Sequence, residues 1–221
     1  MVCVNWSHMQ IQKFLDERVT QYPRFKALQK RVRSKEANAQ NKNFVWQVAG
    51  PFGLVLALLG INASNKMPSA IELAQRMVVS VVVYDFGLYL VHCMQHTHPL
   101  AKHFHQAHHK VQLYAVDVTK GDPVDFFEFF IPMIITPWYF QSNIFEVWAM
   151  CYILQMHGCI VHSGQSIAWL DTLCNAMHIV GPRFHALHHV KHSSNYGVVF
   201  TLWDEVFGTC VTTDEMNVRL N

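Results

Sequence analysis

The chain has 221 residues, of which 51% are hydrophobic and only 14% are charged, and its formal net charge is +2 at pH 7. This length suits one domain of ordinary size, and the charged fraction is well below that of typical soluble domains. The composition therefore favours a membrane protein that keeps a polar part. No basic helix with interleaved aromatic side chains is present, so a nucleic-acid partner is not expected.

The segment 1–43 is predicted to be a basic amphipathic region. Apolar side chains recur at helical spacing from Ile11 to Tyr22, and nine lysines and arginines make the segment basic. This pattern fits a helix lying on an anionic membrane surface, or equally a solvated helix packed on the rest of the protein. The segment lacks the continuous apolar core of a signal peptide, so no cleaved leader is expected.

Four apolar segments follow, and each is long enough to cross most of a bilayer. The predicted spans are 44–61, 69–92, 123–140 and 143–162. Helix-start signals mark the last three: Ser69 with Glu72, Asp122 with Pro123, and Asn143 with Glu146. Pro132 and Pro137 are expected to kink the third span.

The distribution of basic residues predicts the orientation of these spans. Nine lysines and arginines precede the first span, whereas the two turns expected on the far side carry only Lys66. Because cytosolic segments are enriched in lysine and arginine, the N-terminus is expected to be cytosolic. Four crossings then return the C-terminus to the cytosol.

Histidine is concentrated in one part of the chain, with fourteen of the fifteen residues between His92 and His192. Positions i, i+3 and i+4 share a helix face, and three sets follow this spacing. The sets are His92 and His96; His105, His108 and His109; and His185, His188 and His189. Imidazole is a common ligand of iron, zinc and copper, and eight aligned rings exceed the capacity of one ion. The pattern therefore predicts two metal ions, whereas isolated residues such as His8 and His103 are interpreted as ordinary.

Asp85 lies on the face of the second span that carries His92 and His96. Two roles are open for it: a carboxylate that orients a ligating histidine, or a structural hydrogen bond to a neighbouring helix. The six cysteines show no paired spacing and are expected to be buried free thiols. Cys93 points about 100° away from His92 on a helix, so it is not counted as a ligand.

Several of these segments together resemble the fatty acid hydroxylase and sterol desaturase superfamily of membrane oxygenases. They are DFGLYLVHCMQH at 85–96, HQAHH at 105–109, HSG at 162–164, PRFHALHH at 182–189, NYG at 195–197 and WDEVFGT at 203–209. The resemblance implies an all-α membrane protein with four transmembrane helices and a cytosolic helical cap that holds a histidine-rich dimetal centre. The resemblance also implies that nine histidines bind the metals, namely His92, His96, His105, His108, His109, His162, His185, His188 and His189. The NYG and WDEVFGT segments are expected to close the cap structurally.

The chain departs from the family pattern at a few positions. Cys93 stands where the family often has arginine, and His157 and His178 have no clear counterpart. His157 and His162 lie about 140° apart on a helix, so one unbroken helix cannot aim both at the metals. A break at Gly158 could change this, but His162 is preferred as the ligand. Whether His157 or His178 also ligates stays open.

The resemblance also implies an activity, with 44–221 forming one fatty acid hydroxylase-like oxygenase domain. That activity is O₂-dependent hydroxylation or desaturation of a membrane lipid, with two iron ions for which zinc can substitute. Electrons are expected from an external donor such as cytochrome b5 with NAD(P)H, since the chain has no HPGG-like haem-binding segment. The expected location is the endoplasmic reticulum membrane.

A sterol is the favoured substrate because the box spacing and the HSG segment look most like the sterol-oxidising branch. Fatty acyl, sphingoid and alkylglycerol substrates stay open. A non-enzymatic metal-binding membrane protein is the alternative from another class. It would place its ligands along the spans or in a disordered loop, whereas these histidines flank helices at one predicted membrane face.

Overall fold

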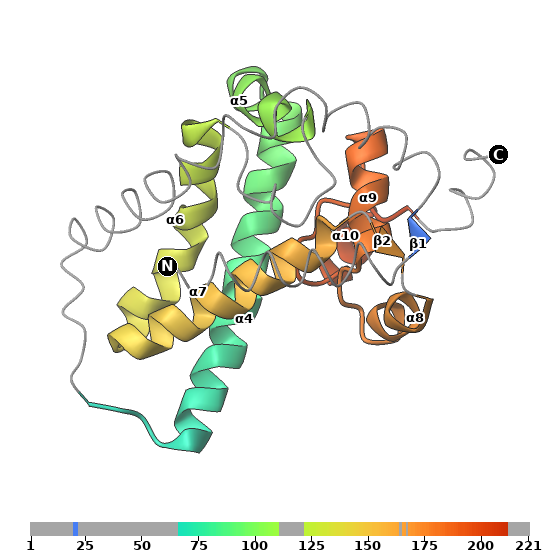
Figure 1. The fold of residues 1–221 in the computed structure, drawn as a ribbon. Coiled ribbons are helices and arrows are strands. Elements are labelled where there is room, and N and C mark those ends of the chain that lie inside the picture. The colour runs from blue at the N-terminus through green and yellow to red at the C-terminus, as the bar shows by residue number, and fades with distance from the viewer. Residues whose placement is uncertain (1–19, 22–65, 111–121, 164, 167, 212–221) are drawn as a thin grey trace, which may run out of the picture.

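The computed structural model describes residues 20–21, 66–110, 122–163, 165–166 and 168–211 (Figure 1). The predicted span 44–61 and nearly all of the basic segment 1–43 lie outside these residues. The exception is strand β1, Thr20–Gln21, which pairs antiparallel with strand β2, Gln165–Ser166. The helix predicted over Ile11 to Tyr22 spans Thr20 and Gln21, and it is wrong at these two residues because pairing with a distant strand overrides the local periodicity.

The described part of the chain is otherwise helical. Its helices are α4 (Ala70–Thr97), α5 (Pro99–Lys110), α6 (Pro123–Phe140), α7 (Ile144–Val161), α8 (Ala168–Ala176), α9 (Pro182–Lys191) and α10 (Leu202–Phe207). The second, third and fourth predicted spans correspond to α4, α6 and α7. Helix α4 continues past its predicted end at His92 to Thr97. It ends there because His98 precedes Pro99 and takes an extended conformation, which a following proline favours.

The three predicted helix starts are confirmed. Ser69, Asp122 and Asn143 are the N-caps of α4, α6 and α7. At α7 the capping box is complete, since Asn143 accepts from the Glu146 backbone N–H and the Glu146 carboxylate accepts from the Asn143 N–H. At α4 only half of the box forms, because the Glu72 carboxylate pairs with Arg76.

Helices α4 and α6 pack closely and run in opposite directions. At one end, the Arg76 guanidinium near the start of α4 donates to the Phe140 carbonyl oxygen at the end of α6, over 3.4 Å. At the other end, the Gln95 side chain donates to Asp125 in the first turn of α6. A methyl group on Gly87 would lie 2.7 Å from the Pro132 side chain, so glycine permits this close approach.

Helix α7 begins close to the end of α6 and passes obliquely across α4 (Figure 1). Arg76 also reaches the Glu146 carboxylate near the start of α7, over 3.5 Å. A buried cluster then joins α4 to α7 and to the chain before α10. Its members are Tyr84, Leu88, Met150, Leu154 and Val199. The start of α4, the end of α6 and the start of α7 therefore lie together, away from the end of α4.

Two helices in the described residues, α4 and α7, are long and apolar enough to cross a membrane by length and composition. In each, only 33% of the most apolar window is buried inside the protein. Large apolar side chains face outward instead, including Ile71 at 74% exposure and Trp148 at 57%. Helix α6 contributes a shorter apolar stretch, Phe130–Phe140. These features suit helices in contact with lipid better than the core of a soluble protein.

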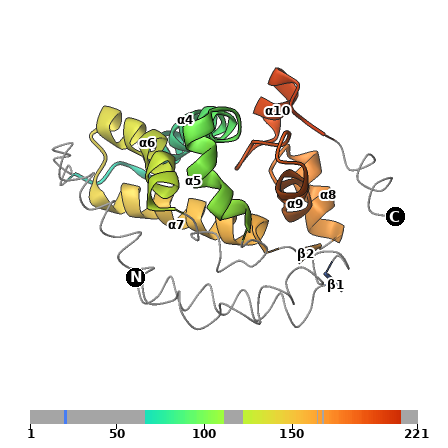
Figure 2. The same cartoon turned by 90° about the horizontal axis from the view of Figure 1, so that it is seen from above.

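Helices α8, α9 and α10 form a cap. Figure 2 shows α8, α9 and α10 grouped on one side, with α4, α5 and α6 on the other. The NYG and WDEVFGT segments fix this cap through the buried Asp204 carboxylate. It accepts from the backbone N–H of Tyr196 (2.8 Å) and Gly197 (2.6 Å) and from the Thr209 hydroxyl (2.6 Å). The expectation that these segments are structural is confirmed.

Candidate metal centre

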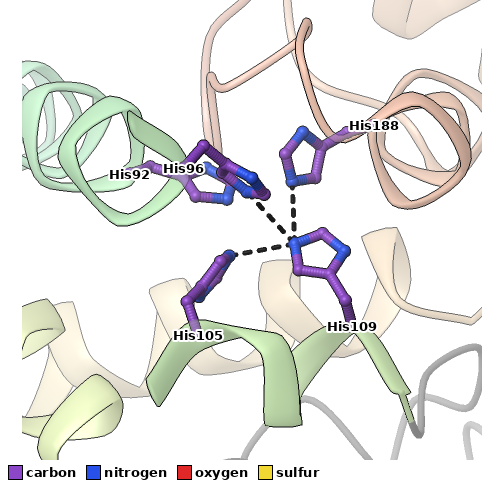
Figure 3. A group of neighbouring side chains, drawn as sticks. All are labelled: His92, His96, His105, His109 and His188. Atoms are coloured by element: carbon purple, nitrogen blue, oxygen red, sulfur yellow. Dashed lines mark hydrogen bonds between the residues drawn. The ribbon is translucent and has the colours of Figure 1, made fainter. Parts of the chain in front are cut away.

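All nine histidines that were predicted as ligands converge in the structure, in two groups. The five-histidine group contains His92, His96, His105, His109 and His188, and the four-histidine group contains His108, His162, His185 and His189. Within each group, one ring nitrogen from every residue lies within 4.8 Å of the others. Figure 3 shows the rings of the five-histidine group pointing toward one another from three helices.

The two HxxHH boxes are each divided between the groups. On α5, His105 and His109 join the five-histidine group, while His108 joins the other. Helix α9 does the reverse: His185 and His189 join the four-histidine group and His188 joins the five-histidine group. Residues four apart point in nearly the same direction, and the residue between them is turned enough to reach the neighbouring group. Both groups therefore need both helices.

The ring nitrogens are spaced like ligands of one ion. His109 Nε2 lies 2.9 Å from His105 Nε2, 3.1 Å from His96 Nε2 and 3.3 Å from His188 Nε2 (Figure 3). A ring nitrogen carries at most one proton, so three such contacts cannot all be hydrogen bonds. Two nitrogens bound to one ion at about 2.0–2.1 Å, at right or tetrahedral angles, lie about 2.8–3.4 Å apart.

The four-histidine group has the same spacing. His162 Nε2 lies 2.9 Å from His185 Nε2 and 3.3 Å from His108 Nε2. His189 Nε2 lies 2.9 Å from His185 Nε2. A divalent cation at the centre of each group would replace the repulsion between these nitrogen lone pairs with attraction. Both groups fit one ion each.

Four of the rings are oriented by a hydrogen bond at their other nitrogen, and for three of them the tautomer is defined. The Nδ1–H groups of His92, His188, His162 and His105 donate to the Tyr196 carbonyl (2.7 Å), the Ser194 carbonyl (2.8 Å), the Gly158 carbonyl (2.8 Å) and the Asp125 carboxylate (2.8 Å). A carbonyl oxygen can only accept, so in the first three pairs Nδ1 carries the proton. The Nε2 lone pair then points into the group, which is the arrangement found for metal-binding histidines.

Burial keeps these imidazoles in the neutral form that binds metal. Burial, helped by the neighbouring rings, lowers the pKa of His105 to about 2. For His162, burial lowers the pKa to about 4, although the bond to Gly158 acts in the opposite direction. Burial also lowers the pKa of His188 well below its usual value. Nitrogen-only donor sets of this kind suit iron, zinc or copper.

The two histidines whose role was open lie outside both groups. His157 Nε2 donates to the Val198 carbonyl oxygen over 3.0 Å, and His178 Nδ1 pairs with the Glu205 carboxylate on the outer surface over 2.9 Å. The preference for His162 over His157 agrees with this placement. No break at Gly158 is needed, because α7 stays helical to Val161 while the two rings point in different directions.

Of the two roles open for Asp85, the structure favours the structural one. Its carboxylate accepts from the backbone N–H groups of Val199 (2.8 Å) and Phe200 (3.1 Å) and from the Trp203 indole (2.9 Å). It thereby holds the cap on α4. The carboxylate beside a candidate ligand is Asp125, which the sequence analysis missed. The sequence feature that could have pointed to Asp125 is its position as an acidic residue in the first turn of an apolar helix.

These features describe a helical membrane-type protein with two histidine clusters, each of which could hold a metal ion. The family model described as Fatty acid hydroxylase matches residues 77–209. Since this match covers more than half of the chain, the chain belongs to the fatty acid hydroxylase family. The predicted resemblance is thereby confirmed.

Curated relatives are similar over the same region. The chain is 29% identical over 154 residues to methylsterol monooxygenase 1 of Gallus gallus, covering 66% of this chain and 49% of the relative. It is 26% identical over 160 residues to a putative methylsterol monooxygenase of Dictyostelium discoideum, covering 72% and 59%. A Delta(7)-sterol 5(6)-desaturase of Gibberella zeae is 27% identical over 149 residues, covering 62% and 42%.

The chain spans about half the length of the curated relatives it matches. No solved structure matches it.

Proposed function

We propose that this chain is a membrane-bound, O₂-dependent lipid oxygenase that hydroxylates or desaturates a C–H position of its substrate with a di-iron centre. The observation that carries the proposal is the convergence of nine histidines in two groups, with the Nε2 atoms turned inward. Membership of the fatty acid hydroxylase family supports the same activity. Zinc is expected to replace iron at these nitrogen sites without supporting the reaction.

The protein's own contribution is to hold and orient the metals. Removal of hydrogen from an unactivated carbon needs activated oxygen, which two bound iron ions supply. The nine imidazoles act as ligands, and the carbonyl groups of Tyr196, Ser194 and Gly158 fix three of them in orientation. Nine nitrogens fill fewer than the roughly twelve positions of two six-coordinate ions, so positions remain for exogenous ligands.

The proposed membrane arrangement has four spans, namely residues 44–61, α4, α6 and α7. Both termini and the histidine site lie on the cytosolic side, in the endoplasmic reticulum membrane. The contacts of Arg76 at one end of the bundle and of Asp125 at the other support antiparallel crossings. The histidines lie at or beyond the ends of α4 and α7, so a lipid in the bilayer can reach them without leaving it.

A sterol is the proposed substrate, and the similarity to methylsterol monooxygenases from chicken and slime mould and to a fungal sterol desaturase supports it. Electrons are proposed to come from cytochrome b5 or a similar carrier, reduced by NAD(P)H through a reductase. Fatty acyl, sphingoid and alkylglycerol lipids are the other substrates that an assay must include.

The test is oxidation of membrane lipids under ¹⁸O₂. Membranes that carry the chain receive iron, NADH, cytochrome b5 and its reductase, and the lipids are analysed by mass spectrometry. A labelled alcohol, or an alkene formed with labelled water, is expected from the wild type but not from His188→Ala. The exposed His178, which lies outside both groups, provides the matched control His178→Ala. If the lipids stay unchanged in membranes that are loaded with iron and supplied with electrons, the oxygenase function is refuted. A non-enzymatic metal-binding protein then becomes the better interpretation.

A further inference from the structure

Asp125 is a buried carboxylate at the junction of three helices. It lies in the first turn of α6 and is only 2% exposed. Its Oδ1 atom accepts from His105 Nδ1 on α5 and from the Gln95 side chain on α4, both over 2.8 Å. Burial of a carboxylate is costly unless donors compensate it, and here both donors come from helices that carry the metal site.

The contact with His105 differs in kind from the backbone contacts of the other anchored rings. Tyr196 and Ser194 each present a neutral carbonyl to a histidine of the five-histidine group, whereas Asp125 presents a carboxylate. When Asp125 is ionised, its hydrogen bonds are charge-assisted and roughly twice as strong as those between neutral groups. A carboxylate on Nδ1 also raises the basicity of Nε2, the atom that faces the other rings.

Among the described residues, the contacts of Asp125 lie on the side of the five-histidine group. His105 belongs to the five-histidine group, and the charge of Asp125 also acts on the His92 ring of that group. Gln95, which steadies the carboxylate, lies on α4 between the same group's His92 and His96. The described contacts of Asp125 thus lead to the five-histidine group.

We propose that Asp125 is a positioning residue for the five-histidine group, and that its charge selectively strengthens metal binding there. This inference rests on the proposed dimetal function. It makes the two metal positions unequal. The five-histidine group loses metal affinity when Asp125 is neutralised, and the four-histidine group does not. It also couples α6, which supplies none of the nine histidines, to the metal centre.

The test uses Co²⁺ as the probe, on the full chain purified in detergent, stripped with a chelator and titrated under chelator competition. The variant Asp125→Asn keeps an acceptor oxygen of the same shape and removes only the charge. We expect Co²⁺ affinity at the five-histidine group to fall 10- to 100-fold, as is typical when the partner of a ligating histidine is changed. One Co²⁺ absorption component should weaken accordingly, and Asp125→Glu should recover part of the loss.

Two backgrounds assign the effect to a group. In His189→Ala only the five-histidine group is complete, and Asp125→Asn should weaken its Co²⁺ binding. In His96→Ala only the four-histidine group is complete, and the same change should leave its affinity unaltered. Asp85→Asn is the matched control, since Asp85 is also buried but its bonds within the described residues go to α10 and the loop before it. It should lower the melting temperature and keep both affinities.

The outcomes separate this inference from the proposed function. Equal affinity in wild type and Asp125→Asn, or an equal fall at both groups, would overturn the inference. If Asp125→Asn does not fold, the pair Asp125→Glu and Asp125→Gln makes the same comparison of charge at constant length. Selective Co²⁺ loss in a chain that oxidises no lipid would uphold the inference and refute the oxygenase function. A wild type that binds no Co²⁺ would overturn both.

Discussion

Gly197 in the NYG segment is a sensitive point of the fold, because two oxygens crowd the position where a side chain would begin. In Gly197→Ala the added methyl group would lie inside van der Waals contact with the Phe200 carbonyl oxygen and 2.8 Å from Asp204 Oδ2. Neither oxygen can retreat easily: the Phe200 oxygen belongs to the backbone, and Asp204 accepts from the backbone N–H of both Tyr196 and Gly197. Each hydrogen bond to a charged group contributes about 1.5–3 kcal/mol, so we expect a loss of about 3–6 kcal/mol in the free energy of unfolding.

The assay is thermal unfolding of the detergent-purified chain. A loss of this size should lower the melting temperature by on the order of 10 °C. Because the Tyr196 carbonyl oxygen orients His92, metal affinity of the five-histidine group should fall as well. The matched control is Gly208→Ala: Gly208 has φ +71° but open space around it, so only about 1 kcal/mol of backbone strain is expected. A Gly197→Ala variant as stable as Gly208→Ala would refute the reasoning.

Three further predictions concern the metals, the membrane and pH. His108→Ala and His188→Ala should each lower the bound metal and abolish lipid oxidation, and full metal content by elemental analysis would contradict this. Glycosylation tags at 65 and 142 should be modified in microsomes while tags at either end should not, and a modified C-terminal tag would exclude the four-span arrangement. The pKa of His162 falls from an unfolded value near 6.5 to about 4, so the folded chain binds fewer protons than the unfolded chain between these values. The melting temperature of metal-free protein should therefore fall as the pH drops from 6.5 toward 4, and a rise would contradict the burial of these rings.

Sequence periodicity was sufficient to find eight of the nine ligand candidates, because the relevant geometry is local, whereas His162 came from the family resemblance. The i, i+3, i+4 spacing of His105, His108 and His109 defines one helix face, and the structure brings all three to the site. Helix starts at Ser69, Asp122 and Asn143 were predictable for the same reason, since a cap involves only the next few residues.

Partners that lie far apart along the chain were not predictable from spacing. Asp85 and Asp125 are both acidic residues in apolar helices, and helical periodicity favoured Asp85 because it shares a face with His92. In the structure, Asp85 binds the loop before α10, whereas Asp125 binds His105. The second contact depends on how α4, α5 and α6 pack. The same holds for the Tyr196 and Ser194 carbonyls and for the division of each HxxHH box between two groups.

The most direct test of the account is the number and coordination of bound metals in the purified wild-type chain. Elemental analysis and X-ray absorption at the zinc edge of the zinc-loaded protein measure both quantities. The nine converging imidazoles predict two ions per chain, with nitrogen ligands at about 2.0–2.1 Å and no sulfur ligand. One ion per chain, or a zinc–sulfur distance near 2.3 Å, would contradict the central claim.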